Sequence, residues 1–457
     1  MKDNRMDIAI IDGSIHNIFD VELYRKKILK DNILKNDIHA TTCYLILKKY
    51  AKNFRCSNVC LLGSNNGKDI FNLYNALNWC FKNNILLVNL SFGTTHFKDF
   101  PHIQKTINYF ANKGMIFVCA TSNDGMKTYP ASLSSVIGVK TSNCKTLLPI
   151  FDIYLGIDFI APSTHEVDVF GDCITTIYSN SYAAPYVTAK LSNLIIQNKY
   201  PFDIKEIKKN LLGKSYHQPF SPDWISNAII IGNYKKSKAN YYFHHTDNLA
   251  EIEKVDTIII CDNRTIDFDI KKKNLVFLFN DTSLLTKNIL SNAGFCWTPL
   301  CKKKQITAVV PSNDEICIPV VSIVIDDTID KFYLLTQLNK YFSIDNYNTY
   351  IICEDSKSVL YNLEYIPIEF LINSNRFINT FIYEQTKYQQ SDLIIFCTCK
   401  QIKNNIECDF EVTISNLKSQ LLIILKNKSG FVDKLVLNFD EPTIFQILYN
   451  KLINLLS

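Results

Sequence analysis

Short apolar runs separated by amphipathic stretches dominate the first half of the chain. A short continuous apolar run is typical of a parallel strand that is buried on both faces. Such strands, alternating with helices, predict an α/β fold built on a doubly wound parallel sheet. The predicted strands are Ile8–Ile11, Val59–Leu62, Ile85–Leu90, Met115–Ala120 and Ser135–Val139, and helical spacing is seen at 68–82 and 103–111.

One further apolar stretch, Val187–Ile196, has helical spacing and follows the polar turn Tyr178-Ser179-Asn180-Ser181. Ser181 is therefore expected in the first turn of a buried helix, where unpaired backbone N–H groups and the helix dipole favour negative charge. That position suits a nucleophile whose attack creates an oxyanion. The alternative is a serine N-cap on an ordinary core helix.

The pattern loosens after a charged helix expected at Asp203–Leu212, and polar and aromatic residues dominate up to residue 247. We therefore expect a first domain over residues 1–235, a linker at 236–248 and a second domain over residues 249–457. Alternating apolar runs return after the linker and predict a second α/β domain. Its strands are expected at Thr257–Cys261, Leu275–Phe279, Pro319–Ile325, Tyr350–Cys353, Leu393–Phe396 and Leu421–Leu425, with a final helix at 441–456.

Within the second domain, the strand ending at Ile325 is followed by three aspartates and Lys331. The layout is distantly similar to a phosphate-binding loop, with Lys331 at the place of that loop's lysine. Such a loop needs glycines so that its backbone N–H groups can surround a phosphate, and none is present. The aspartates would also repel an anion. A degenerate nucleotide-binding-like domain that contacts a partner protein or a leader peptide is the favoured interpretation.

Composition adds limits on partners and location. The 457 residues are 47% apolar and 20% charged with a net charge of +5, which is typical of a soluble globular protein. The chain has no arginine-rich block, so we expect no nucleic-acid binding. It also has no signal peptide and no apolar run of membrane-spanning length, so a cytoplasmic location and no membrane association are predicted. The 15 cysteines are then expected as reduced core residues without metal or cofactor.

Two side chains in the first half are expected near the carboxyl ends of the parallel strands, where functional groups gather in an open sheet. Asp12 directly follows the first strand, and functional groups gather at the carboxyl ends of parallel strands. His39 precedes an apolar helix and would lie at its start. Each signal alone is weak, because turn aspartates and bystander histidines are common.

The segment from Asp7 to about Ile196 resembles the subtilisin-like serine peptidases, the subtilase family. Five sequence blocks carry the resemblance, and they occur in the family's order of aspartate, histidine and serine. They are Ile10-Ile11-Asp12-Gly13-Ser14, His39-Ala40-Thr41, Asn89-Leu90-Ser91-Phe92-Gly93, Ala120-Thr121-Ser122-Asn123-Asp124-Gly125 and Ser179-Asn180-Ser181-Tyr182-Ala183-Ala184-Pro185.

The resemblance implies a serine endopeptidase that acts on a peptide or protein. By the resemblance Ser181 is the nucleophile, His39 its general base, and Asp12 the group that orients the imidazole. Asn123 and the backbone N–H of Ser181 would form the oxyanion hole. Ser91, Phe92 and Gly93 would offer backbone groups to an extended substrate. The early aspartate strand fits an intracellular type, and similar small enzymes with appended domains are associated with the maturation of ribosomally made peptides.

The blocks also depart from the family pattern. Ala40, Ser122 and Ser179 stand where the family usually has glycine, and Asn180 replaces a threonine. Because glycine permits unusual backbone angles, these changes predict a tighter or distorted cleft. Two alternatives to an active peptidase remain: an inactive subtilase-like module that binds an extended peptide, and a scaffold in which both domains only dock partners.

Overall fold

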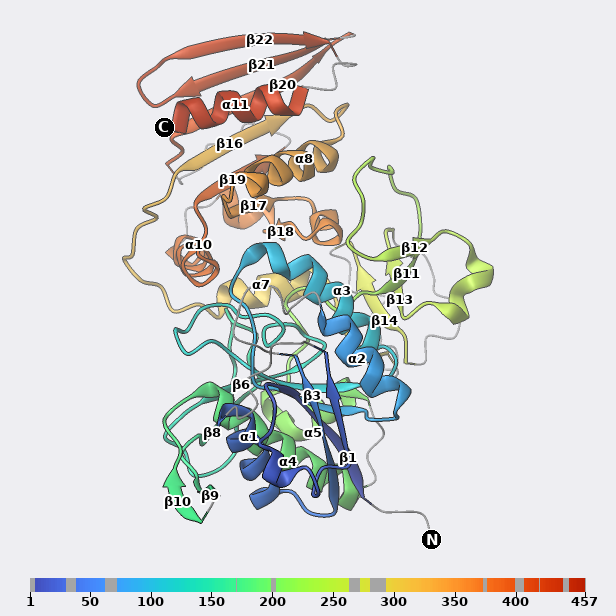
Figure 1. Ribbon diagram of the computed structural model, residues 1–457. Helices are drawn as coiled ribbons and strands as arrows, with labels where there is room; N and C mark the ends of the chain where they lie inside the picture. Colours follow the sequence, from blue (N-terminus) through green and yellow to red (C-terminus); the bar gives the residue numbers. More distant parts are fainter. Residues whose placement is uncertain are drawn as a thin grey trace. The chain divides into compact units, whose positions relative to one another are not determined.

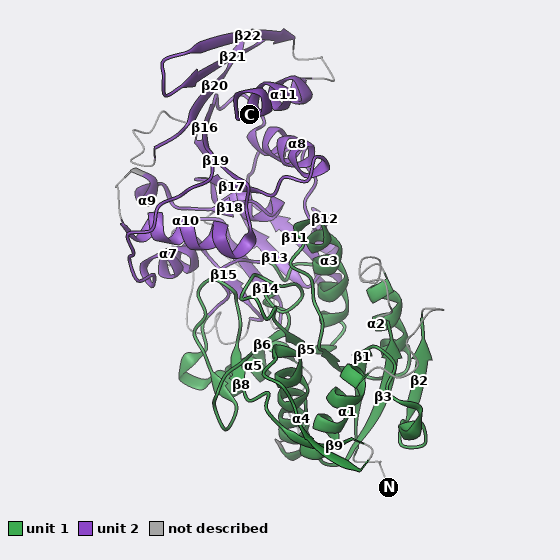
Figure 2. Cartoon of the chain, turned by 60° about the vertical axis from the view of Figure 1, so that its left-hand side comes forward, with its two compact units in different colours: residues 1–217, 223–226 green, residues 218–222, 227–457 purple. Residues whose placement is uncertain are grey.

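The computed structural model describes residues 5–29, 38–61, 72–169, 171–198, 203–262, 272–279, 293–372, 376–398, 407–418, 420–438 and 444–456 (Figure 1). The chain forms two compact units, residues 1–217 with 223–226 (unit 1) and residues 218–222 with 227–457 (unit 2) (Figure 2). Parallel sheets with helices between their strands occur in both, so the predicted α/β class is confirmed.

Unit 1 is built on an eight-stranded sheet of order β2-β3-β1-β4-β5-β6-β8-β7, parallel except for the β7–β8 pair. The central strands are buried on both faces, as their apolar runs predict. The strands are β1 (Met6–Asp12), β2 (Arg25–Ile28), β3 (Phe54–Cys60), β4 (Leu87–Leu90), β5 (Ile116–Ala120), β6 (Ile137–Thr141), β7 (Leu148–Pro149) and β8 (Phe159–Ala161). A separate hairpin pairs β9 (Glu166–Val169) with β10 (Asp172–Thr175).

The helices of unit 1 form two packed pairs. Helix α4 packs on α1 and on strands β4, β5, β6 and β8, while α2 packs on α3. Ile8 and Ile10 of β1 share one buried cluster with Ala40 of α1 and Val187 of α4, which fixes α1 and α4 on the same face. The helices are α1 (Ile38–Tyr50), α2 (Leu73–Lys82), α3 (Phe100–Ala111), α4 (Asn180–Asn198) and α5 (Ile204–Leu212).

Unit 2 contains two sheets. The first has five parallel strands in the order β12-β11-β13-β14-β15, namely β11 (Asn227–Ile231), β12 (His244–Thr246), β13 (Thr257–Ile260), β14 (Asn274–Phe277) and β15 (Cys296–Trp297). The second has the order β18-β17-β19-β16-β20-β21-β22, with an antiparallel ending from β20 onward. Its strands are β16 (Val320–Ile325), β17 (Thr349–Cys353), β18 (Glu364–Tyr365), β19 (Leu393–Thr398), β20 (Phe410–Leu417), β21 (Gln420–Asn427) and β22 (Val432–Asn438).

Five helices lie in the described part of unit 2 and connect these strands or close the chain. They are α7 (Pro299–Thr307), α8 (Lys331–Ile344), α9 (Ile368–Ile372), α10 (Arg376–Gln389) and α11 (Ile444–Leu456). Short 3-10 turns lie at Asn17–Phe19, Phe97–Asp99, Gly213–Ser215, Leu249–Lys254 and Ser356–Tyr361 across both units. Among the described residues, no helix combines the length and the apolar character needed to cross a membrane.

The units divide at residues 217–227, before the linker expected at 236–248. The reason is the short run Ala228-Ile229-Ile230-Ile231, which forms β11 and pairs in parallel with β13. Residues 244–246 add β12 on its other side. The expected linker therefore contributes a strand to the first sheet of unit 2.

Lys331, the residue expected to mimic a phosphate-binding lysine, is the first residue of α8. Its ammonium group lies 2.9 Å from the carboxylate of Asp355, and the Asp330 carboxylate caps the helix by accepting the N–H of Tyr333. Two carboxylates therefore occupy the region where a phosphate would need N–H donors, which argues against a phosphate site at this helix start.

Candidate active site

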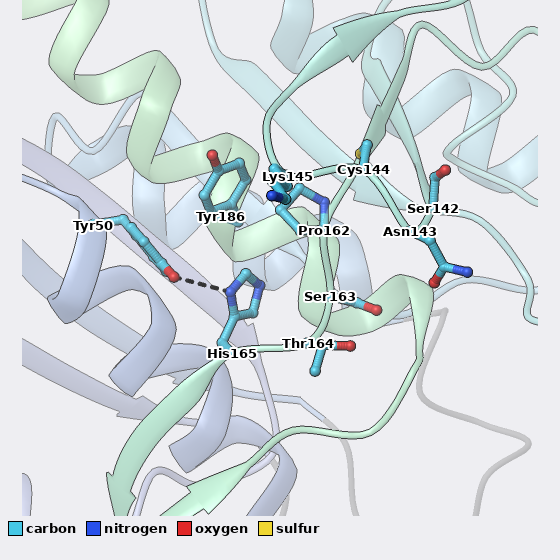
Figure 3. Close-up of a pocket in the computed structure, with 10 residues that line it drawn as sticks. All are labelled: Tyr50, Ser142, Asn143, Cys144, Lys145, Pro162, Ser163, Thr164, His165 and Tyr186. Carbon is cyan, nitrogen blue, oxygen red and sulfur yellow. Dashed lines mark hydrogen bonds between the residues drawn. The ribbon is translucent and has the colours of Figure 1, made fainter.

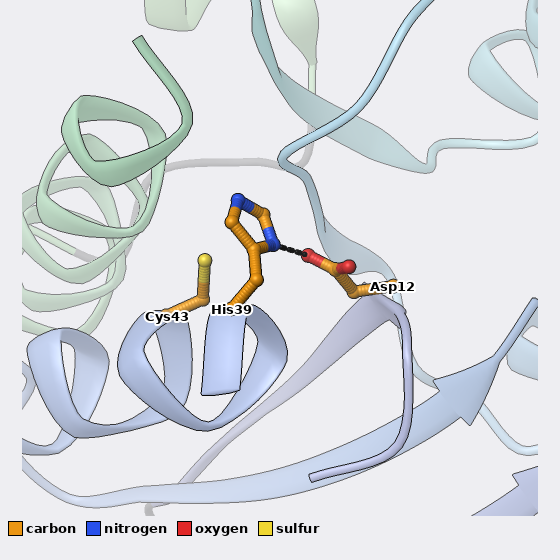
Figure 4. Close-up of side chains that lie close together, drawn as sticks. All are labelled: Asp12, His39 and Cys43. Atoms are coloured by element: carbon orange, nitrogen blue, oxygen red, sulfur yellow. Dashed lines mark ion pairs between the residues drawn. The ribbon is translucent and has the colours of Figure 1, made fainter. Parts of the chain in front are cut away.

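Asp12 is the last residue of β1, at the carboxyl end of a central strand, and it is fully buried. One carboxylate oxygen, Oδ1, accepts the N–H of Gly13 at 2.7 Å. The other, Oδ2, lies 3.0 Å from Nδ1 of His39 (Figure 4). A buried carboxylate next to Nδ1 stabilises the tautomer whose proton is on that nitrogen, so the lone pair of the neutral ring lies on Nε2.

His39 is the second residue of α1, and about a third of its side chain (34%) is exposed. The ring faces the Tyr182 ring, with 5.4 Å between the centroids. Because Tyr182 follows Ser181 in α4, this contact brings the histidine beside the first turn that carries the predicted nucleophile. The structure thus gathers the aspartate, histidine and serine blocks at one edge of the sheet.

Ser181 and Ser91 form a reciprocal serine pair, in which each hydroxyl donates to the other residue's backbone carbonyl. The Ser181 hydroxyl reaches the Ser91 oxygen at 3.0 Å, and the Ser91 hydroxyl reaches the Ser181 oxygen at 2.9 Å. A hydroxyl group has a single proton to donate. The proton of Ser181 is therefore held by Ser91 in this arrangement, and the hydroxyl must rotate before it can give that proton to an imidazole.

A buried polar chain supports the reciprocal serine pair. The Asn89 amide donates to the Ser91 hydroxyl at 2.9 Å. The Thr188 hydroxyl lies 3.0 Å from the Asn89 side-chain oxygen and 2.9 Å from the Ala184 carbonyl oxygen, and its single proton is shared between these two acceptors. Both supporting residues are fully buried. Sequence reasoning did not assign Thr188 a role. The available signal was the polar Asn89 inside the apolar run of β4, because a buried amide needs partners.

Asn123, the predicted oxyanion residue, lies against the first turn of α4. Its Oδ1 accepts the backbone N–H of Asn180 at 2.9 Å, and its Nδ2 lies 3.4 Å from the Ser179 hydroxyl. Asn180 in turn accepts the Thr141 N–H and donates to the Ser122 carbonyl. The unusual residues at 179 and 180 therefore fill their positions with hydrogen bonds that tie α4 to the loop after β5.

The departures from glycine require no left-handed backbone. Ala40, Ser122 and Ser179 are not among the described non-glycine residues that have positive φ angles. At Gly93, by contrast, the available space requires glycine. A Cβ at that position would lie 2.8 Å from the Tyr129 carbonyl oxygen. The distortion expected from the three replaced glycines therefore has no counterpart in their backbone angles.

A pocket of about 400 Å³ lies beside this edge of unit 1, between the ends of β6 and β8 and the helices α1 and α4 (Figure 3). His165 on its wall is buried, and its Nδ1 lies 3.2 Å from the Tyr50 hydroxyl. Burial lowers the pKa of His165, while the backbone carbonyls of Tyr182 and Pro162 oppose that change. Sequence reasoning did not identify this pocket. Its lining is Tyr50, Ser142, Asn143, Cys144, Lys145, Pro162, Ser163, Thr164, His165 and Tyr186.

Comparison with known families matches residues 47–218 to the subtilase family. The match contains the serine, asparagine and substrate-strand blocks, and it begins after Asp12 and His39. Two curated relatives are the minor extracellular protease Epr of Bacillus subtilis (strain 168), 32% identical over 127 residues, and the M-protease of Shouchella clausii (strain KSM-K16), 23% identical over 155 residues. These alignments cover 27% and 33% of this chain, and only 18% and 40% of the two relatives. The chain therefore spans less than half the length of either relative.

Solved structures give weaker likenesses. A lanthipeptide protease matches with a TM-score of 0.37 and 16% identity, covering 44% of this chain and 78% of that one. The prenylagaramide maturation protease PagA also has a TM-score of 0.37, with 20% identity, 45% coverage of this chain and 82% of its own. The family match and the curated relatives confirm the resemblance that the sequence blocks indicated. Residues 47–218 thus form a subtilase-family segment within this chain.

Proposed function

We propose that the chain is a serine endopeptidase that hydrolyses peptide bonds through an acyl-enzyme on Ser181. The single observation that carries the proposal is the 3.0 Å contact between the buried Asp12 carboxylate and Nδ1 of His39, beside the helix turn that holds Ser181. The subtilase-family match of the segment around Ser181 supports the same assignment.

In the proposed reaction, Nε2 of His39 takes the proton of the Ser181 hydroxyl as the oxygen attacks the peptide carbonyl. Asp12 stabilises the imidazolium that forms, and the same proton then passes to the leaving amine. The tetrahedral oxyanion is stabilised by the Ser181 N–H and by the Asn123 amide after its Nδ2 turns from Ser179 toward the substrate. Water repeats the sequence on the acyl-enzyme and releases the acid.

The reciprocal serine pair gives this mechanism a substrate-dependent step. The Ser91 carbonyl accepts the Ser181 hydroxyl at 3.0 Å, and the same carbonyl belongs to the segment proposed to pair with an extended peptide. A peptide N–H that hydrogen-bonds to Ser91 would replace the hydroxyl as the donor. The hydroxyl would then be released to rotate toward His39, so binding and activation would occur together.

The proposal also extends to the substrate of the peptidase and to its location in the cell. The curated relatives are named as proteases, which supports a peptide or protein substrate. Processing of a precursor or leader peptide in the cytoplasm, with unit 2 docking the precursor or a partner protein, extends the sequence prediction. The catalytically inactive peptide-binding module is the second candidate, and the hydroxyl held by Ser91 is the observation that favours it.

A fluorophosphonate probe tests the activity, because it reacts covalently with an activated serine hydroxyl. With a fluorophosphonate that carries a peptide N–H for the Ser91 carbonyl, we expect one label per chain in the wild type and none in S181A or H39A. S192A is the matched control, since Ser192 lies on the same helix and its buried hydroxyl has no hydrogen-bond partner among the described residues. If the folded wild type stays unlabelled even with a peptidyl probe, the inactive binding module is the better description.

A further inference from the structure

Three potential metal ligands of different chemistry converge beside the reciprocal serine pair. Asp12, His39 and Cys43 each offer one ligand atom, and these atoms all lie within 4.8 Å of one another (Figure 4). His39 and Cys43 are four residues apart on α1, which places them on the same helix face. Among the residues that the structure describes, no other group of three or more such ligands was found.

The surroundings of Cys43 differ from those of an ordinary core cysteine. Its sulfur is buried and lies 3.5 Å from the Ser91 hydroxyl and 3.7 Å from the Ser181 carbonyl oxygen. Buried structural cysteines usually pack as small apolar side chains. Cys43 instead points its sulfur at the polar groups on which the proposed chemistry depends.

The geometry points to a site for one Zn²⁺ ion on Asp12, His39 and Cys43, and we infer that the bound ion switches the peptidase off. Zinc accepts carboxylate, imidazole and thiolate ligands together, while calcium and magnesium require oxygen ligands. Zinc bonds of about 2.0 Å to nitrogen and oxygen and about 2.3 Å to sulfur separate tetrahedral ligand atoms by about 3.3 to 3.6 Å. The group therefore needs side-chain shifts of about 1 Å to close around the ion.

Binding converts the Cys43 thiol into a zinc-bound thiolate, and its proton leaves to the solvent. A water molecule completes four ligands. The ion takes the lone pair of one ring nitrogen of His39, beside the charge of Asp12, and the single ring proton stays on the other nitrogen or moves to it through water. With one nitrogen bound to the metal and the other protonated, the imidazole can no longer accept the Ser181 proton. The inhibition rests on the proposed function, whereas the binding site itself does not.

Metal binding is measured first, without any substrate. Chelator-treated full-length protein is titrated with ZnCl₂ by calorimetry, and bound zinc is counted by elemental analysis. We expect one ion per chain, with affinity at least about tenfold weaker in both C43A and H39A. C80A is the control, because Cys80 is another buried thiol in unit 1 but lies on α2. Zinc affinities within about threefold of wild type in C43A and H39A, or no binding to wild type, would overturn the site.

Cobalt gives an independent signature of the ligands. With Co²⁺ in place of Zn²⁺, we expect a thiolate-to-cobalt charge-transfer band in wild type and C80A and its loss in C43A. A band that survives in C43A means that another thiol binds the metal, which rejects the assignment. Circular dichroism of each variant confirms that it is folded before the spectra are compared.

Inhibition is tested separately by fluorophosphonate labelling. Added zinc should block labelling of wild type and C80A, a chelator should restore it, and C43A should need at least about tenfold more zinc for the same block. Zinc that binds through Cys43 without slowing the labelling overturns the inhibition alone. Protein that is never labelled but still shows the cobalt band contradicts the peptidase and leaves the metal site standing.

Discussion

At the level of single residues, the proposed catalysis depends most directly on the contact between Asp12 and His39. We expect D12N to lower kcat by about 10⁴-fold, because an amide at this position stabilises the wrong imidazole tautomer while the geometry stays intact. The measurement is turnover of a peptide substrate by the purified variant, alongside its thermal unfolding. D20N is the control, since Asp20 pairs with Lys26 at an exposed site. A D12N enzyme that keeps a tenth of the activity would remove Asp12 from the mechanism.

Asp223 is a second informative residue, because burial raises its pKa to about 6. A raised pKa means that the folded state binds the proton more tightly, so stability is highest in acid and is lost as the pH rises from about 4 through about 6. D223N has no such proton. We expect the free energy of unfolding of D223N, relative to wild type, to rise by about 2 kcal/mol between about pH 4 and pH 7.5. Urea unfolding of both proteins at the two pH values measures it, and parallel pH profiles would contradict the assignment.

At the level of elements, α5 is anchored to the sheet of unit 1 by one buried ion pair. The Lys208 ammonium lies 2.9 Å from the Asp158 carboxylate, which also accepts the Gly138 N–H. Burial raises the pKa of Asp158, and the lysine charge opposes that rise. Removing only the cation leaves an uncompensated buried charge, which typically destabilises a protein by about 3 to 5 kcal/mol.

We therefore expect K208M to lower the free energy of unfolding by about 3 to 5 kcal/mol, and K209M, one residue along α5 and exposed, to change it by no more than about 0.5 kcal/mol. Urea titrations at neutral pH compare the two variants. Because acid protonates Asp158, the deficit of K208M should shrink as the pH falls. Equal effects of the two substitutions would mean that the ion pair contributes nothing specific.

The elements that sequence predicted best are those whose residues face apolar neighbours on every side. β1, β4, β5, β13, β16, β17 and β19 all appear within or overlapping the predicted runs. The predictions at Leu62, at 68–71 and at 441–443 lie outside the described residues.

Strands with polar faces were missed. The edge strand β2 reads Arg25-Lys26-Lys27-Ile28, and the β9–β10 hairpin exposes most of its residues. β22 alternates between exposed and half-buried positions, and its apolar run is only Leu435-Val436-Leu437. Pairing along an edge depends on the neighbouring strand, which a local pattern does not contain.

The sequence predicted the individual site residues, but local patterns did not show that these residues come together in space. The positions of Asp12, His39, Ser181 and Asn123 at element ends followed from the run boundaries and the family blocks. The reciprocal bonds between Ser91 and Ser181 could not be predicted, because they join residues 90 positions apart through a hydroxyl rotamer. The convergence of Cys43 with Asp12 and His39 likewise depends on how α1 packs against β1.

At the level of the whole molecule, the chain crosses between its units through residues 217–227, and one short piece of that crossing belongs to unit 2. The Gln218 side chain accepts the Cys296 N–H, and the Phe220 carbonyl accepts the indole N–H of Trp297, both at 3.0 Å. Trp297 is fully buried, so its indole needs this partner. The segment is therefore attached by two hydrogen bonds to β15, the edge strand of the first sheet of unit 2.

This assignment predicts how unit 2 can be isolated. A fragment of residues 218–457 carrying W224F should be more stable than residues 227–457 by about 2 to 6 kcal/mol, since the shorter fragment lacks these two buried hydrogen bonds. Trp297 is then the single tryptophan in both fragments, and its fluorescence during urea unfolding reports the difference. Equal stability of the fragments would show that residues 218–226 are dispensable.

The carbonyl that holds the Ser181 proton has a consequence for which molecules could be cleaved. A donor is needed to take the hydroxyl's place on Ser91, so a backbone nitrogen without hydrogen, as in proline or an N-methylated residue, would leave the nucleophile occupied. Small esters, which bring no amide at all, would face the same barrier. The resting protein would therefore distinguish peptides from other acyl compounds by whether one backbone nitrogen of the substrate carries a hydrogen. This selection would precede any recognition of side chains.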